Sequence, residues 1–167
     1  MFRRMFQAFP ELPGEGIVLR FRDRSLRDRS QGIKESITYD ICLKGSDAYA
    51  GYISLRLGES PEIYYLGHIG YRVEEPYRGH GLAARAVRAM MPLIRENRFA
   101  SLTITTDPDN IPSRKTCERL GCILESIVPV PRRYRPLCMN SPAKCRFILL
   151  TAEPAIEERT AQHDSSG

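Results

Sequence analysis

The sequence has no long hydrophobic run. None of its apolar stretches approaches the ~20 residues that a membrane-spanning helix needs. The basic start at residues 1–6 is followed by neither an apolar segment nor a cleavage site, which argues against a signal peptide. We therefore expect no membrane partner.

Closely spaced metal ligands and paired cysteines are also missing. The five cysteines include no Cys-x-x-Cys pair, and the three histidines, at positions 68, 80 and 163, do not have metal-ligand spacing. The sequence thus predicts no metal site. An odd number of unpaired cysteines is typical of free thiols in a reducing compartment, so we expect a cytoplasmic protein.

Length and charge limit the remaining classes. A chain of 167 residues suits one domain with a sizeable core. The net charge of +5 raises the question of nucleic-acid binding. However, the densest basic run, residues 20–29, also contains Asp23 and Asp28, and no aromatic residues alternate with the basic ones. We expect no nucleic-acid partner, although a basic nucleic-acid-binding domain remains an alternative.

The hydrophobic pattern predicts an α/β fold, with an irregular segment at 1–14, one domain over 15–151 and a disordered tail over 152–167. Strands are expected at 17–21, 36–43, 49–57, 63–73, 101–106, 122–130 and 145–151, and helices at 80–97 and about 110–120. Gly67 and Gly70 interrupt the fourth strand, which indicates a bulge or the close approach of a ligand. Antiparallel strands followed by strand–helix–strand units predict a layered sheet of mixed direction.

The segment around Arg78, Gly79 and Gly81 carries the clearest functional signal. An extended run at 69–73 leads into this glycine turn, and a helix follows at once. Glycines allow the backbone to approach a ligand closely. The helix start offers free N–H groups and the positive end of its dipole. The sequence therefore predicts a phosphate-binding site.

Two motifs resemble one family. The spacing Arg78-x-x-Gly81-x-Ala83 resembles the pyrophosphate loop of the GNAT superfamily, the acetyl-CoA-dependent N-acetyltransferases. The stretch 110–113, followed by Cys117 and by Leu120-Gly121, resembles the second cofactor element of that family. The tripeptide at 69–71 is similar to the ribosomal-protein-type N-terminal acetyltransferases within it.

The resemblance implies a GNAT fold: a mostly antiparallel sheet, helices on both faces, and a parallel strand pair that a bulge splays to admit the pantetheine arm. It also implies direct acetyl transfer from acetyl-CoA to a primary amine, either a protein α-amine or a small molecule, in a ternary complex. The implied cofactor-binding residues are Tyr71, Arg72, Val73, Arg78, Gly79, His80, Gly81, Leu82, Ala83, Asn110 and Ser113. Backbone N–H groups near 71–73 are the expected oxyanion donors.

Three residues are candidates for proton transfer. His68 stands where similar acetyltransferases have a glutamate proposed as the base, and a histidine could take the amine proton through a water. Glu74 and Glu75 are alternatives. Cys117 occupies the position where the family often has the tyrosine that reprotonates the thiolate, and Tyr134 could replace it.

One departure from the family concerns the acceptor side. GNAT domains usually carry two helices between the first and second strands, but here only about a dozen polar residues are available, so the loop at 131–145 is the candidate for acceptor recognition. The uncertain base and the missing tyrosine leave a non-catalytic acyl-CoA-binding module as the alternative. Phe2, Phe6 and Phe9 could pack on a second copy to form a homodimer, or cover the sheet.

Overall fold

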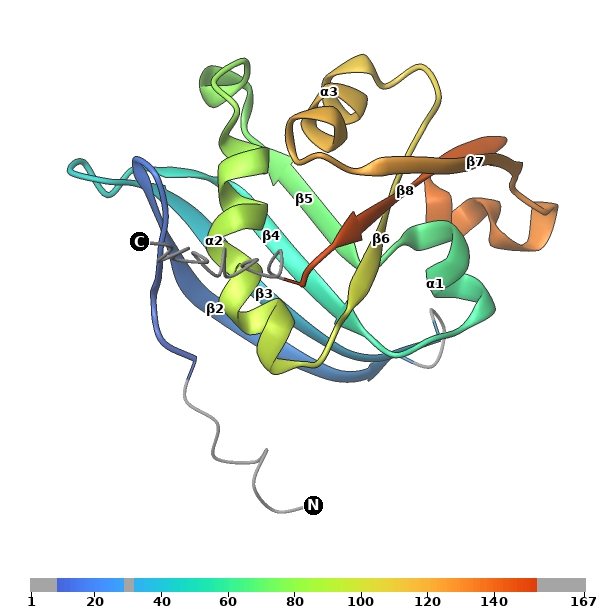
Figure 1. Cartoon of the computed structure of the whole chain (residues 1–167), viewed down its shortest axis with the longest axis horizontal. Coiled ribbons are helices and arrows are strands. Elements are labelled where there is room, and N and C mark those ends of the chain that lie inside the picture. The colour runs from blue at the N-terminus through green and yellow to red at the C-terminus, as the bar shows by residue number, and fades with distance from the viewer. Residues whose placement is uncertain (1–8, 29–31, 153–167) are drawn as a thin grey trace, which may run out of the picture.

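The computed structural model describes residues 9–28 and 32–152 and contains two antiparallel sheets (Figure 1). The predictions about Phe2, Phe6 and the tail beyond 152 lie outside these residues. The five-stranded sheet has the order β1 (Leu12–Pro13), β2 (Ile17–Asp28), β3 (Ile33–Leu43), β4 (Tyr49–Leu57) and β5 (Ile69–Val73). The three-stranded sheet has the order β6 (Ser101–Thr106), β8 (Ala143–Leu150) and β7 (Ile123–Pro129).

Helix α2 (Leu82–Glu96) covers one face of the five-stranded sheet (Figure 1). Its apolar residues recur at helical spacing, and Ala86, Val87 and Met90 are fully buried against the alternate, core-facing residues of β2, β3 and β4. The helix predicted at 80–97 is confirmed. Helix α3 (Ile111–Arg119) packs beside α2 and begins at the Asn110 cap, as expected.

The two sheets part between β5 and β6, which run in the same direction and are connected through α2 (Figure 1). They meet at one end, where the His68 N–H donates to the Thr103 carbonyl over 2.8 Å. Beyond that contact no strand ladder joins them. We call this place the β5–β6 fork; it is the splayed parallel pair that the resemblance implies.

The backbone of β5 turns alternate residues toward the fork. The Arg56 N–H donates to His68 O and the Glu74 N–H donates to Ala50 O, so the even-numbered residues of β5 form the hydrogen-bonded pairs with β4. The N–H and C=O groups of Tyr71 and Val73 therefore point away from β4, toward β6. The predicted N–H donors at these two residues are geometrically available, whereas Arg72 faces β4.

The prediction of a single strand over 63–73 is wrong in its first half. Residues Pro61–Leu66 form helix α1, because the Ser60 side chain accepts the Ile63 N–H and Pro61 stands in the first turn. Gly67, with φ of 78°, ends the helix. The register between β4 and β5 is unbroken, so the bulge expected there is absent, and the fork arises where β6 diverges.

Outside residues 29–31, which the structure does not describe, no helix lies between the first two long strands. The polar residues from 22 onward extend β2 to Asp28, and β3 begins at Ile33, so both strands exceed their predicted lengths. Cross-strand ion pairs, Arg22–Asp40 and Arg24–Glu35, stabilise these polar positions in the sheet. The expected absence of the usual two helices thus gives a long hairpin.

Two smaller elements also differ from the predictions. The segment predicted as irregular contains β1, whose Leu12 is buried and pairs with Leu19. The loop expected at 131–143 contains a 3-10 helix, η3 (Arg132–Cys138), which packs against α1. Helix α1 contacts the three-stranded sheet through Thr105 and Arg146, which donate to the Tyr65 and Tyr64 carbonyls and whose chain neighbours Ile104 and Cys145 face the core.

Candidate functional site

The glycine loop lies directly beyond the end of β5. Gly79 and Gly81 have φ of 83° and 72°, a region that other residues rarely adopt, and a Cβ at Gly79 would meet no atom within 4 Å. The Arg78 Nε donates to the Val73 carbonyl over 2.9 Å, which holds the loop against the strand. Leu82 and Ala83 are buried, so they present N–H groups rather than side chains at the helix start.

Three arginines that the sequence analysis did not single out surround this loop. An open hollow is lined by the loop residues 79–81, including the exposed His80, and by Arg85, Arg88 and Arg119. The Arg88 Nη2 donates to the Arg119 carbonyl over 2.6 Å, and the Arg119 Nη1 lies 3.3 Å from where a Gly81 Cβ would be. Arg85 and Arg88 are three residues apart on α2, so the sequence places them on one helix face. Arg119 belongs to α3, and only the tertiary fold brings it to the loop. The hollow concentrates positive charge where phosphates would bind.

A hydrogen-bonded chain links α3 to the fork. The Asn110 side chain accepts the Ser113 N–H at 3.2 Å, and the Ser113 Oγ shares a 2.7 Å hydrogen bond with the Tyr71 hydroxyl. At the end of β6, the buried Thr106 Oγ1 has no hydrogen-bond partner among the described residues. A buried, unsatisfied hydroxyl between the fork and Asn110 fits a ligand that brings polar groups, such as the amides of a pantetheine arm.

Cys117 and Tyr71 lie close together behind this chain. Cys117 is fully buried, and its pKa is raised by a hydrogen bond with Cys122 and by burial. Burial also raises the pKa of the Tyr71 phenol to about 12. Both groups therefore keep their protons at neutral pH, and a thiol with a raised pKa is a poor proton donor. The acid role predicted for Cys117 stays a prediction, and Tyr71 adds a phenol whose side chain the sequence analysis did not use.

His68 joins the two sheets at the closed end of the fork. The Thr103 N–H donates to His68 Nδ1 over 3.0 Å, so this nitrogen carries no proton. Nε2 then donates to the Glu59 carboxylate over 2.8 Å. The side chain is buried and its ring meets Phe99 edge-on. The predicted base role would require His68 to release one of these partners, so the geometry favours a positioning role.

Replacing His68 with alanine is expected to lower the free energy of unfolding by about 1–3 kcal/mol, because the buried Thr103 N–H loses its acceptor. Urea unfolding would measure this. Glu59→Gln is the matched control, since the exposed amide can still accept the Nε2 proton. A stable His68→Ala protein whose pH–rate profile has lost one ionisation would instead identify a base.

Tyr134 does not meet the other two catalytic candidates. It lies on η3, where its ring stacks on Tyr65 of α1 with centroids 5.1 Å apart, and the Arg133 guanidinium lies over its outer face. The contact joins α1 to η3. Its predicted role as an acid stays untested.

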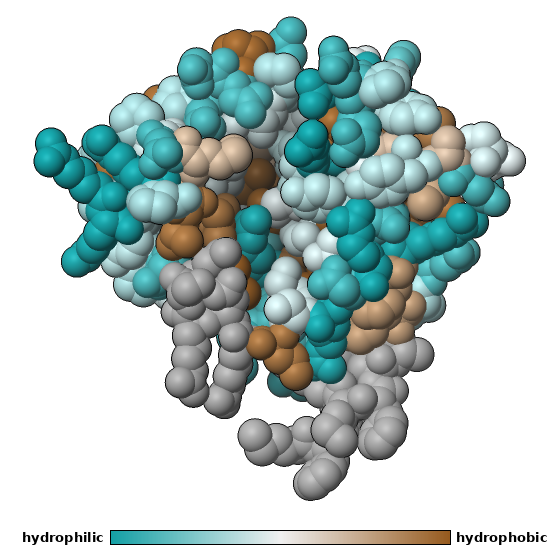
Figure 2. All heavy atoms as spheres, turned by 180° about the vertical axis from the view of Figure 1, so that it is seen from behind, coloured by the Kyte–Doolittle hydropathy of each residue, from teal (hydrophilic) through white to brown (hydrophobic). Residues whose placement is uncertain are grey.

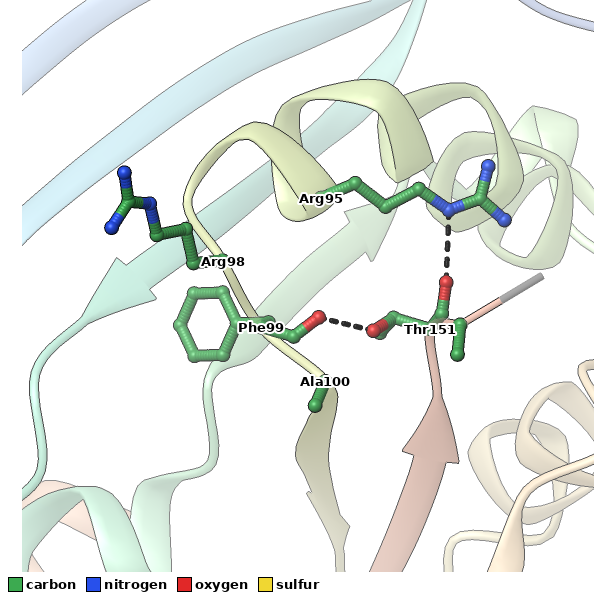
Figure 3. Close-up of a pocket in the computed structure, with 6 residues that line it drawn as sticks. Arg95, Arg98, Phe99, Ala100 and Thr151 are labelled. Atoms are coloured by element: carbon green, nitrogen blue, oxygen red, sulfur yellow. Dashed lines mark hydrogen bonds between the residues drawn. The ribbon is translucent and has the colours of Figure 1, made fainter.

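A second hollow lies at the opposite end of α2 (Figure 3). It is lined by Arg95, Phe99 and Thr151, among others. The Arg95 Nε donates to the Thr151 carbonyl over 2.8 Å, and the Thr151 hydroxyl donates to the Phe99 carbonyl. These bonds tie the end of β8 to the turn after α2. The hollow therefore belongs to a structural junction, far along α2 from the glycine loop.

The chain matches the family description "Acetyltransferase (GNAT) domain" over residues 6–123. No curated protein matches it. Among solved structures, it is similar to RimL, a ribosomal L7/L12 α-N-protein acetyltransferase, with 18% identity, 87% of this chain and 100% of that chain covered, and a TM-score of 0.62. RimL in complex with coenzyme A gives 16% identity, coverage of 84% and 98%, and a TM-score of 0.59.

The ribosomal-protein-S5-alanine acetyltransferase from Vibrio fischeri is similar at 18% identity, with 71% of this chain and 64% of that chain covered and a TM-score of 0.55. These similarities show a common fold. That fold, combined with the match over residues 6–123, defines the class of protein as an acyltransferase. The chain belongs to the GNAT family of acetyltransferases.

The described residues contain neither a candidate membrane-spanning helix nor a candidate metal-binding group. No helix in residues 9–28 and 32–152 is long and apolar enough to cross a membrane. Within the same ranges, no group of three or more His, Cys, Asp or Glu side chains could hold a metal ion.

Proposed function

We propose that the protein transfers an acetyl group from acetyl-CoA directly to a primary amine, in a complex that holds both substrates. One observation carries this proposal. The left-handed glycines of the loop, the start of α2 and the outward-facing N–H of Tyr71 form one continuous set of donors from the phosphate hollow into the fork. Such a set suits a ligand with phosphates at one end and a thioester carbonyl at the other.

Each part of the site has a separate task. The loop residues 79–83 and the arginines around them hold the phosphates, and Asn110, Ser113 and Thr106 offer polar contacts along the arm. The Tyr71 and Val73 N–H groups stabilise the oxygen that becomes negative as the amine attacks. The new C–N bond forms while the C–S bond breaks, the amine loses a proton, and the sulfur gains one.

We assign the Tyr71 hydroxyl to the sulfur. It reaches the first turn of α3 and lies against Cys117, the position from which the family tyrosine acts. With a pKa of about 12, the phenol keeps its proton and stabilises the developing thiolate as a hydrogen-bond donor. The α-amine at the start of a polypeptide, with a pKa near 8, costs only about 1.4 kcal/mol to deprotonate at pH 7, whereas a more basic amine costs more. Cytoplasmic location and a homodimer stay predictions.

Acetyl-CoA is expected to stabilise the protein by about 2.7 kcal/mol at a hundred times its Kd. Thermal unfolding with acetyl-CoA, and with ATP and NAD as controls, would measure this. Release of free thiol with a panel of amines would then separate an enzyme from a non-catalytic acyl-CoA-binding module. An unchanged melting temperature at millimolar acetyl-CoA would overturn the proposal.

A further inference from the structure

Arg56 carries a positive charge that no carboxylate among the described residues balances. Its neighbours Leu55 and Leu57 face the core, so its side chain emerges on the opposite face of the sheet from α2. The Nη1 group donates to the carbonyls of Leu66 and Gly67, at 3.3 and 3.1 Å, where α1 ends. Burial lowers the pKa of the guanidinium. A desolvated cation is costly to keep without a counter-charge.

The guanidinium lies against the backbone of β5. A Cβ at Gly70 would be 2.4 Å from the Arg56 Nη2, so a larger residue there would displace the guanidinium from its present position. Gly70 directly precedes Tyr71, whose N–H faces the fork. Arg56 is therefore placed within one residue of the point where the acetyl group would be held, but on the face away from α2.

One edge of the guanidinium has no partner. Within residues 9–28 and 32–152, neither Nε nor Nη2 of Arg56 makes a hydrogen bond. This edge presents two parallel N–H groups, the arrangement that binds both oxygens of a carboxylate. A phosphate would be held better by several cations, which do not converge here.

Two carboxylates of this region, Asp107 and Glu74, are paired with other cations, and no carboxylate of the described residues lies within ion-pair distance of Arg56. Cys138 lies close to Arg56, Lys144 and Asp107, and the last two form an ion pair. On β5, Arg72 is 3.5 Å from Glu74. Figure 2 shows the face opposite α2, where polar side chains surround a central hollow with apolar atoms at its floor. A counter-charge for Arg56 must come from outside these residues.

We propose that Arg56 binds a carboxylate of the acceptor, which is therefore a small amine of the α-amino-acid type. The inference rests on the proposed function, because it assumes an amine that attacks beside Tyr71. Arg56 lies against Gly70, one residue before Tyr71, so a carboxylate bound to it would lie close to the attacking nitrogen. An α-amino acid has its carboxylate in that position, one carbon away from its nitrogen. A peptide N-terminus has a neutral amide there and leaves the guanidinium unbalanced.

Calorimetric titration of the coenzyme A-saturated protein with alanine and with alaninamide tests this without turnover. We expect alanine to bind at least tenfold more tightly than alaninamide. Equal binding, or tighter binding of alaninamide or of an alanine-starting peptide amide, would overturn the inference. The same comparison can be made in the thiol-release assay. Alaninamide has the lower amine pKa, so a larger fraction of it is neutral and reactive, and this difference opposes the preference expected for alanine.

Arg56 variants locate the effect. Arg56→Gln is expected to weaken alanine binding at least tenfold and to leave alaninamide within twofold, while Arg56→Lys restores part of the preference. Arg98→Gln is the control, because Arg98 is an exposed arginine in the turn after α2, outside the segments proposed to bind either substrate. Equal losses for alanine and alaninamide in Arg56→Gln would show a structural role for Arg56.

The two proposals fail in different ways. If acetyl-CoA does not bind or no amine releases thiol, the proposed function fails, whatever the titrations show. If amines are acetylated but alanine has no advantage over alaninamide in binding or in KM, only the carboxylate inference fails.

Discussion

Replacing Gly81 with aspartate is expected to weaken acetyl-CoA binding at least 100-fold, which corresponds to about 2.7 kcal/mol. Gly81 caps α2 with φ of 72°, so any side chain there strains the backbone. The new carboxylate would also lie beside the Arg119 guanidinium and occupy the position proposed for a phosphate. Two effects, strain and like-charge repulsion, thus act in the same direction.

Gly45→Asp is the matched control. Gly45 has φ of 95° in the exposed turn between β3 and β4, and a Cβ there meets no atom within 4 Å. The substitution adds the same charge and similar strain at a position far from α2. Calorimetry with acetyl-CoA should find the affinity of this variant within about twofold of the parent. A Gly81→Asp protein that binds acetyl-CoA normally would refute the phosphate site.

Replacing Tyr71 with phenylalanine is expected to lower kcat about 10- to 100-fold, because the loss of a hydrogen bond to a charged group costs about 1.5–3 kcal/mol. The affinity for acetyl-CoA should change little, since the phosphates and the backbone N–H groups remain. The wild-type kcat should show no decline with pH until the phenol ionises, near its pKa of about 12. Below that pH the donor is present, and above it the donor is lost.

Steady-state kinetics from pH 6 upward would measure both effects. Tyr39→Phe is the control: this tyrosine is also buried, but its hydroxyl donates to the Pro10 carbonyl at a remote place. If Tyr71→Phe keeps its full kcat and loses only stability, Tyr71 merely joins β5 to α3.

The sequence was most informative where local chemistry alone decides the structure. The apolar spacing of α2 and the glycine turn at 79–81 were predicted and are confirmed, and of the two possible caps of the next helix, Asp109 and Asn110, the structure has Asn110. The main error, at residues 63–66, arose because a short apolar run fits a strand or a buried helix equally well. The local signal that favours the helix is Ser60-Pro61, an N-cap residue followed by a proline in the first turn.

The candidate site was predictable only in part, for a physical reason. Residues 78–83 act through backbone geometry that glycine spacing reveals. Arg119 and Arg56 became candidates only because the fold places them beside residues that are remote in the sequence. Arg119 lies beside Gly81, and Arg56 lies beside Gly70. His68 suggested a base by its position in the chain, but its two hydrogen-bond partners appear only when β5 meets β6.

The contact between α1 and η3 has a consequence for the divergence of such proteins. The proposed donor site is formed by residues 78–83 and 110–119. The proposed acceptor side is formed by Arg56, by α1, whose last carbonyls Arg56 binds, and by η3, which the Tyr65–Tyr134 stack joins to α1. The two sets share no stretch of sequence. A duplicated gene can therefore acquire a new acceptor through compensating substitutions in two short segments, and its chemistry and its donor stay as they were.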